Sequence, residues 1–219
     1  MVDTTTQLAA VTRGVQTAVI DGHDTRVQTL SQTYASPIDD VWDAVTSPAR
    51  IERWFLPVEG ELKVGGNYQL IGNAGGTVEE CEAPADGRAR FRATWEYGGG
   101  VSWIGVELLA IDADATVFTL THLARVADVP AEFWDQFGPG ATGVGWDQAL
   151  LGLALNLRGG DTIAPADAET WMLSEDGLLF ARAACDAWAA AQVADGADPV
   201  AARRAADATF AFYTTAPEG

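Results

Sequence analysis

Apolar and polar residues alternate with a period of two through the middle of the chain, which is typical of half-buried β-strands. The alternation runs over residues 26–34, 88–97, 101–111 and 116–124, and short polar or glycine-rich turns separate the last three of these segments. Strands joined by such short turns pair antiparallel, and one face of such a sheet often meets solvent. The pattern therefore predicts an antiparallel sheet that packs its second face against helices.

Helical spacing precedes this strand-rich region. Ser36 and Pro37 form a helix start, with serine at the cap and proline at the first helical position, and a second short helix ends near residue 57. Residues 4–18 also place Leu8, Val11 and Val15 on one helical face. We therefore expect an N-terminal helix before the first strand.

The second half of the chain is helical throughout. Residues 130–137 and 141–157 follow helical spacing, interrupted by Gly138-Pro139-Gly140. The longer helix carries two apolar stripes, Gly143, Trp146, Leu150, Leu153 and Leu157 on one side and Val144, Leu151 and Leu155 on the other. A helix that is apolar on two sides must be covered on two sides. We expect the sheet to cover one side and the C-terminal residues to cover the other.

Two further helices are predicted after residue 160. One begins at Ser174, and the other begins at Asp198 and continues through Phe212. Trp188 and Phe212 would face water unless these helices pack on the outer side of helix 141–157. The sequence thus predicts an α+β protein with a helical N-terminal segment (1–25), a central domain (26–158) and a packed helical extension (159–219).

Composition limits the function classes. The formal net charge is −18, from 31 acidic and 13 basic residues. Because nucleic-acid binding depends on basic side chains that neutralise phosphates, this charge argues against a nucleic-acid partner. The sequence begins without a signal-peptide pattern, has no apolar run long enough to span a bilayer, and contains only two cysteines. We expect a cytoplasmic protein that does not engage membranes.

No cofactor or metal site is expected from the sequence, because the two histidines and two cysteines lie on four unrelated segments. Residues 138–143 match the dinucleotide motif G-x-G-x-x-G in letters only. That motif requires a preceding strand and free backbone N–H groups, whereas here the preceding segment is helical and Pro139 has no N–H. We interpret these residues as a helix kink whose small side chains let neighbouring backbone approach.

The chain resembles the family of activators of the Hsp90 ATPase and their bacterial homologues, within the START and Bet v 1-like (SRPBCC) superfamily. The resemblance covers about residues 26–158 and is carried by YASPIDDVWDAV at 34–45, RIERWF at 50–55, GGNY at 65–68, TWE at 94–96 and FTLTH at 118–122. It implies a helix-grip fold, in which a curved antiparallel sheet wraps around a long C-terminal helix. It also implies a cavity that holds apolar ligands in many relatives. The same fold hosts carriers, cyclases and co-chaperones, so the resemblance does not imply one chemistry.

Eight tryptophans are the most distinctive feature of the composition. Several of them fall in elements expected to surround the cavity, where they would either fill a core completely or line a pocket. The candidate ligand-binding residues are Trp54, Trp95, Trp103, Phe118, Leu120, His122, Trp134, Trp146 and Leu150.

His122 shares one strand face with Phe118 and Leu120. An imidazole on that face would contact a ligand or act as a general acid–base, or else be a buried histidine satisfied by a backbone or indole partner. Asp147 beside Trp146 would cap the helix, pair with an arginine, or assist His122.

The first hypothesis is that the protein binds an apolar or aromatic small molecule without covalent chemistry of its own. The alternatives are a cyclase- or hydrolase-type enzyme that uses His122, and a chaperone regulator that acts through protein contacts. The sequence leaves the oligomeric state open, with a homodimer among the arrangements.

Overall fold

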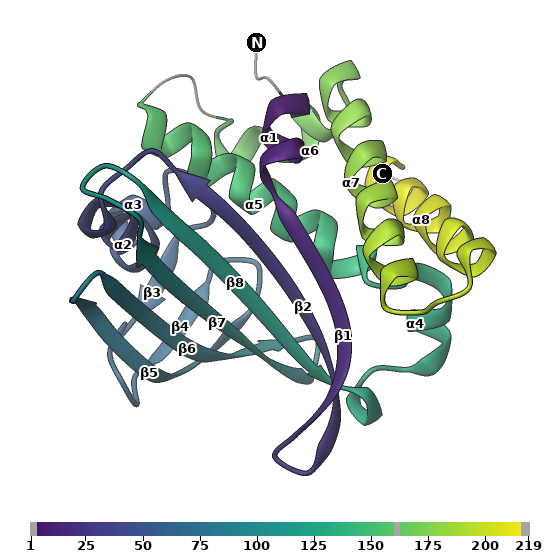
Figure 1. Ribbon diagram of the computed structural model, residues 1–219, viewed down its shortest axis with the longest axis horizontal. Helices are drawn as coiled ribbons and strands as arrows, with labels where there is room; N and C mark the ends of the chain where they lie inside the picture. The colour runs from purple at the N-terminus through teal and green to yellow at the C-terminus, as the bar shows by residue number, and fades with distance from the viewer. Residues whose placement is uncertain (1–3, 160–162, 216–219) are drawn as a thin grey trace.

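A computed structural model describes residues 4–159 and 163–215 of the chain. Within these residues, eight strands form one curved, open sheet in the order β1-β2-β8-β7-β6-β5-β4-β3, and every neighbouring pair is antiparallel (Figure 1). The strands are β1 Thr12–Ile20, β2 His23–Tyr34, β3 Val58–Gly60, β4 Asn67–Leu70, β5 Gly75–Ala85, β6 Arg88–Tyr97, β7 Gly100–Ala110 and β8 Thr116–Arg125. The strand alternation in the sequence is therefore confirmed as one antiparallel sheet.

The helices complete the helix-grip arrangement. They are α1 Thr4–Ala10, α2 Ile38–Thr46, α3 Pro48–Ile51, α4 Ala131–Phe137, α5 Gly140–Arg158, α6 Ala168–Met172, α7 Glu175–Ala194 and α8 Pro199–Thr214, with short 3-10 turns η1 Val126–Asp128 and η2 Pro165–Asp167. The long helix α5 packs between the sheet and α7 (Figure 1). The predicted α+β helix-grip fold is confirmed.

The prediction of a helix over residues 4–18 is wrong beyond Ala10. Helix α1 ends there, and residues 12–20 form strand β1, which pairs with β2 along its whole length from Thr12 opposite Ser31 to Ile20 opposite His23. Asp21 and Gly22 both have positive φ, 51° and 77°, as a two-residue hairpin turn between antiparallel strands requires. Of the segment 1–25 predicted as helical, residues 1–3 lie outside the described residues, 4–10 form α1, and 12–20 form the edge strand of the main sheet.

Helix α5 is buried on both of the sides that carry its apolar stripes. Trp146, Leu150 and Leu153 are buried in the same core cluster as the inner face of the sheet, and Leu151 is buried with Phe180 of α7. Gly143 permits this close packing, because a Cβ atom there would overlap the ring of Trp188. Residues 138–143 thus serve helix packing.

The C-terminal helices pack against α5, and α7 also lies along the edge strand β1 (Figure 1). Trp188 and Phe180 are fully buried there. The expectation that Phe212 is buried is wrong: the residue is 64% exposed. Helix α8 instead turns small residues inward, and its buried positions are Ala202, Ala205, Ala206 and Thr209.

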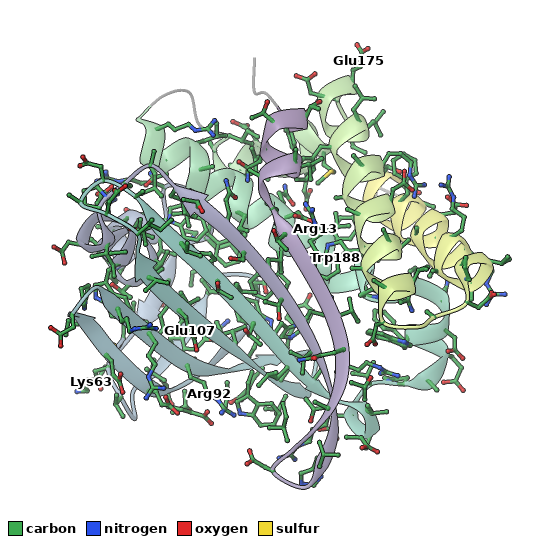
Figure 2. All side chains as sticks on the ribbon, in the orientation of Figure 1. Arg13, Lys63, Arg92, Glu107, Glu175 and Trp188 are labelled. Carbon is green, nitrogen blue, oxygen red and sulfur yellow. The ribbon has the colours of Figure 1, made fainter. Side chains whose placement is uncertain are left out.

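A buried ion pair joins three separate segments at this interface. Arg13 of β1 contacts Asp147 of α5 through Nη2 and Oδ1 at 2.7 Å, and the two side chains are 7% and 0% exposed. The indole Nε1 of Trp188 donates to Asp147 Oδ2 at 2.9 Å. Figure 2 shows Arg13 and Trp188 side by side between β1 and α7. The edge strand, the long helix and the extension therefore share one polar contact inside the core.

We predict that Asp147→Ala lowers the free energy of unfolding by about 3–5 kcal/mol, because it leaves the buried guanidinium of Arg13 without a counter-ion. The double variant Arg13→Met/Asp147→Asn should recover part of this loss, since both charges are removed and the amide oxygen of asparagine still accepts from the indole of Trp188. Denaturant unfolding followed by far-UV circular dichroism measures both variants. A single variant within about 1 kcal/mol of wild type would contradict the assignment of this pair as a structural lock.

Ending the chain at residue 160 removes α7 and α8 and exposes Val144 and Leu151, which are now fully buried. Exposing a side chain of that size costs about 1.5–3 kcal/mol, and Asp147 loses its indole donor as well. We predict an unfolded or aggregated product, measured by size-exclusion chromatography and thermal melting. A soluble monomer that melts within a few degrees of the full chain would show that the extension is dispensable.

Candidate ligand-binding site

A cavity with a free volume of about 140 Å³ lies between the concave face of the sheet, the segment around α3 and the first half of α5. It is partly open to solvent. Its lining residues are Val45, Thr46, Ile51, Trp54, Phe55, Val58, Leu62, Tyr68, Leu70, Val78, Cys81, Phe91, Ala93, Trp95, Ile104, Val106, Phe118, Leu120 and Trp146. This wall, as far as the structure describes it, contains no charged side chain.

Strand alternation places most of the wall. On β6, Phe91, Ala93 and Trp95 point inward, as the strict period of two predicts. On β8, Phe118 and Leu120 share the inner face and are buried. Five residues from two strands thus come together because the pleat turns every second side chain to the same side of the sheet.

Aromatic contacts hold the cavity wall in place. Trp95 and Trp146 meet edge to face with ring centroids 4.9 Å apart, and Trp54 stacks on Phe55 at 5.6 Å. Trp54 is further fixed because its Nε1 donates to the carbonyl oxygen of Ala44 at 2.9 Å. The indoles at the cavity are therefore oriented before any ligand arrives.

The hydroxyl groups of the wall are committed to the protein itself. Tyr68 donates to the carbonyl oxygen of Thr94 at 2.7 Å, and Thr46 donates to that of Trp42 at 2.7 Å. Burial, with the nearby charge of Glu96 as a smaller cause, raises the pKa of Tyr68. Tyr68 is therefore a neutral part of the wall at physiological pH.

The two cysteines differ sharply in access. Cys81 lines the cavity and is exposed, although partial burial raises the pKa of its thiol. Cys185 is buried, and burial raises its pKa to about 12. Because the thiolate is the reactive form, thiol reagents should report on Cys81 and not on Cys185.

Four of the nine candidate residues lie outside the cavity wall. Trp103 points away from it, because Ile104 and Val106 occupy the inward positions of β7, and the guanidinium of Arg125 lies 5.0 Å from its ring. Trp134 lies on α4 with the guanidinium of Arg26 at 4.0 Å. Leu150 packs in the hydrophobic core and does not line the cavity. The ring of His122 lies against the ring of Trp146 and is likewise not part of the cavity wall.

The sequence argument missed several wall residues, of two kinds. Phe91, Ala93 and Ile104 occupy inward-facing strand positions, so the period-two pattern could have identified them as wall residues. Val58 and Leu62 come from a short strand and the loop after it, where no periodicity marks the inward side.

His122 belongs to a polar network on the inner face of the sheet. Its Nε2 lies 2.9 Å from Ser102 Oγ, and its Nδ1 lies 3.4 Å from Gln28 Oε1. Gln28 in turn donates to the carbonyl oxygen of Pro139 at 2.6 Å and accepts from Thr142 at 2.6 Å. The imidazole therefore connects the sheet to the start of α5, and the ring of Trp146, 5.8 Å away, lies against it.

Asp147 pairs with an arginine, one of the alternatives that the sequence left open. Burial raises the pKa of Asp147, while its hydrogen bonds from Arg13 and Trp188 act in the opposite direction. Its carboxylate oxygens are used by these two donors. Among the residues that the structure describes, no group of three or more His, Cys, Asp or Glu side chains is placed to hold a metal ion. No helix in the described ranges is both long and apolar enough to cross a bilayer.

Acidification should destabilise the protein through His122. Burial lowers the pKa of His122 from its ordinary value of 6.5 to about 4, so the unfolded chain binds a proton at this residue more readily than the folded chain. Stability is therefore fully present above pH 6.5 and is lost as the pH falls toward 4. We predict that wild type loses about 2 kcal/mol more than His122→Gln between pH 7 and pH 5, measured by urea unfolding. Parallel pH profiles for the two proteins would contradict this assignment.

A known protein family and several solved structures are similar to this chain. The family model described as activator of Hsp90 ATPase homolog 1-like protein matches residues 35–157, more than half of the 219-residue chain. CalU16 from Micromonospora echinospora is 31% identical in its crystal structure, with 83% of this chain and 98% of CalU16 covered and a TM-score of 0.65. Its solution structure gives 30% identity, 85% and 97% coverage and a TM-score of 0.67.

More distant structures share the fold alone. Protein MLL2253 from Mesorhizobium loti is 17% identical, with 62% of this chain and 99% of that protein covered and a TM-score of 0.50. No functionally curated protein matches the sequence. The family match spans α2, α3, the cavity-lining strands and nearly all of α5, and the chain therefore belongs to the activator of Hsp90 ATPase homolog 1-like family of the Bet v 1-like superfamily.

Proposed function

We propose that the protein binds a small apolar or aromatic molecule in the cavity between the sheet and α5. The observation that carries this proposal is the cavity itself, about 140 Å³ of free volume lined by aromatic and aliphatic side chains. Protein interiors are normally packed to crystal-like density, so a void of this size is unusual. An apolar cavity of about 150 Å³ engineered into another protein stays dry and binds benzene.

The apolar lining of the cavity also supports a ligand. Because the cavity is partly open to solvent, water can enter it, and there it meets mainly aromatic and aliphatic side chains. An apolar molecule that replaces this water removes its own surface and that of the wall from water, which contributes about 25 cal/mol per Å² of apolar area.

The other functions inferred from the sequence gain no specific support from the site. His122 lies outside the cavity wall with both ring nitrogens near polar partners, and burial holds its pKa near 4. This environment does not suit a general acid–base near neutral pH. The enzyme, the chaperone regulator, the homodimer and the cytoplasmic location stay predictions.

Ala93→Leu tests the proposal by filling the cavity. Ala93 is 3% exposed and faces the free volume, so an isobutyl group in place of its methyl group occupies the space a ligand would use. We predict that indane, a neutral two-ring hydrocarbon, binds wild type and binds the variant at least about tenfold more weakly, a difference of about 1.4 kcal/mol. Isothermal titration calorimetry measures both affinities.

Ala183→Leu is the matched control, because Ala183 is exposed on α7 and remote from the cavity. It should bind indane as wild type does. A second readout is the reaction rate of Cys81 with a thiol reagent, which bound indane should slow in wild type and in the control. Wild-type protein that binds neither indane nor related hydrocarbons would sink the proposal.

A further inference from the structure

Gly152 lies in the interior of α5, where glycine is unfavourable compared with alanine because it loses more backbone freedom on folding. The packing around this position explains why glycine is present. A Cβ atom at position 152 would overlap the backbone carbonyl oxygen of Trp54. Because that oxygen belongs to the backbone, no side-chain rotation relieves the overlap. Gly152 therefore allows the chain at Trp54 to lie directly against α5.

This contact closes the ring of structure that surrounds the cavity. The sheet is open, and β3 is one of its two edge strands. Trp54 and Phe55 lie shortly before β3 in the chain, and both line the cavity. Near the other edge, the hydroxyl group of Tyr34 on β2 donates to the carbonyl oxygen of Leu150 on α5 at 3.3 Å. The sheet and α5 therefore meet near both edges of the sheet, at β2 on one side and where Trp54 contacts Gly152 on the other.

The side chain of Trp54 is anchored as well. Its Nε1 donates to the carbonyl oxygen of Ala44 on α2 at 2.9 Å, and its ring stacks on Phe55 with centroids 5.6 Å apart. Another part of the wall contains Ala93 and Ile104, which lie opposite each other in the ladder of β6 and β7. Backbone hydrogen bonds of the sheet hold that part in place. A displacement of Trp54 therefore moves one part of the cavity wall relative to another.

The direction of this displacement follows from the overlapping atoms. A methyl group at position 152 has to push the backbone of Trp54 away from α5. Separation at this contact lengthens the ring formed by the sheet and α5 and so widens the cavity inside it. The single hydrogen atom of Gly152 keeps the ring at its narrowest.

We propose, as a refinement that rests on the proposed function, that Gly152 sets the upper size of the ligand that the cavity accepts. Gly152 is a positioning residue, since it is not part of the cavity wall and acts through Trp54 and Phe55. In wild type the cavity selects compact apolar molecules over bulkier molecules of the same chemistry. One methylene group more or less in an apolar pocket changes affinity by about tenfold or more, so a small displacement of the wall is sufficient to change this preference.

The test compares indane with 1,1-dimethylindane, which has the same rings and two additional methyl groups. Isothermal titration calorimetry gives the ratio of their affinities for wild type, for Gly152→Ala and for Gly145→Ala. Gly145 is the matched control, because it lies on α5 outside the cavity wall, and a Cβ atom there would meet the hydroxyl group of Tyr213 at 3.2 Å. The ratio in favour of indane should fall at least about fivefold in Gly152→Ala and stay within about twofold of wild type in Gly145→Ala.

An unchanged ratio in folded Gly152→Ala protein, whatever the change in its melting temperature, would show that Gly152 serves packing alone and would overturn the refinement. Indane binding to wild type would then still support the proposed function. If neither hydrocarbon binds wild type, the proposed function fails, and the refinement fails with it.

A measurement on wild type covers the case in which Gly152→Ala does not fold. In ¹H–¹⁵N spectra at saturating ligand, 1,1-dimethylindane should shift the backbone amide resonance of Gly152 more than indane does, because the bulkier molecule presses Trp54 away from α5. Equal shifts of this resonance with both compounds would overturn the refinement.

Discussion

The buried carboxylate of Asp147 is the constraint around which the chain is arranged. A charged group taken out of water is tolerated only where partners replace its hydration, and here those partners are Arg13 and Trp188. The three residues come from β1, α5 and α7. Removing any one of these elements therefore leaves a buried polar group without a partner. This contact ties the edge strand β1, which pairs with β2, to α5, since Arg13 reaches Asp147 from that strand.

Helix α5 separates two environments. Trp146 forms part of the cavity wall, whereas Asp147, the next residue, bonds to Arg13 and Trp188 beside the extension. Successive side chains on a helix point about 100° apart, so one turn serves both sides. In the described ranges, no residue after α5 lines the cavity. The extension therefore acts as a support that fixes α5 from behind, and the lining of the cavity comes from the family domain.

The sequence correctly predicted side-chain orientations that depend only on the alternation along a strand. The period of two placed Phe91, Trp95 and His122 on the inner face of the sheet, and all three point there. The same period indicates that Trp103 faces outward. Trp103 lies on the same face of its strand as the charged Glu107, and the apolar Ile104 lies on the opposite face. Contacts between distant segments gave no such signal: Arg13 and Asp147 are 134 residues apart, so the sequence left several partners open for Asp147.

The distribution of charge joins the surface to the cavity. Most basic side chains are used within the protein: Arg13, Arg50, Lys63, Arg90, Arg92, Arg182 and Arg203 form ion pairs, and Arg26 and Arg125 lie over indole rings. The excess of acidic groups is therefore left without nearby cations, and it repels anions before they reach the cavity. An anion that did enter would meet a wall without a counter-charge. Surface and cavity thus disfavour the same class of molecule by two independent effects, long-range repulsion outside and desolvation inside.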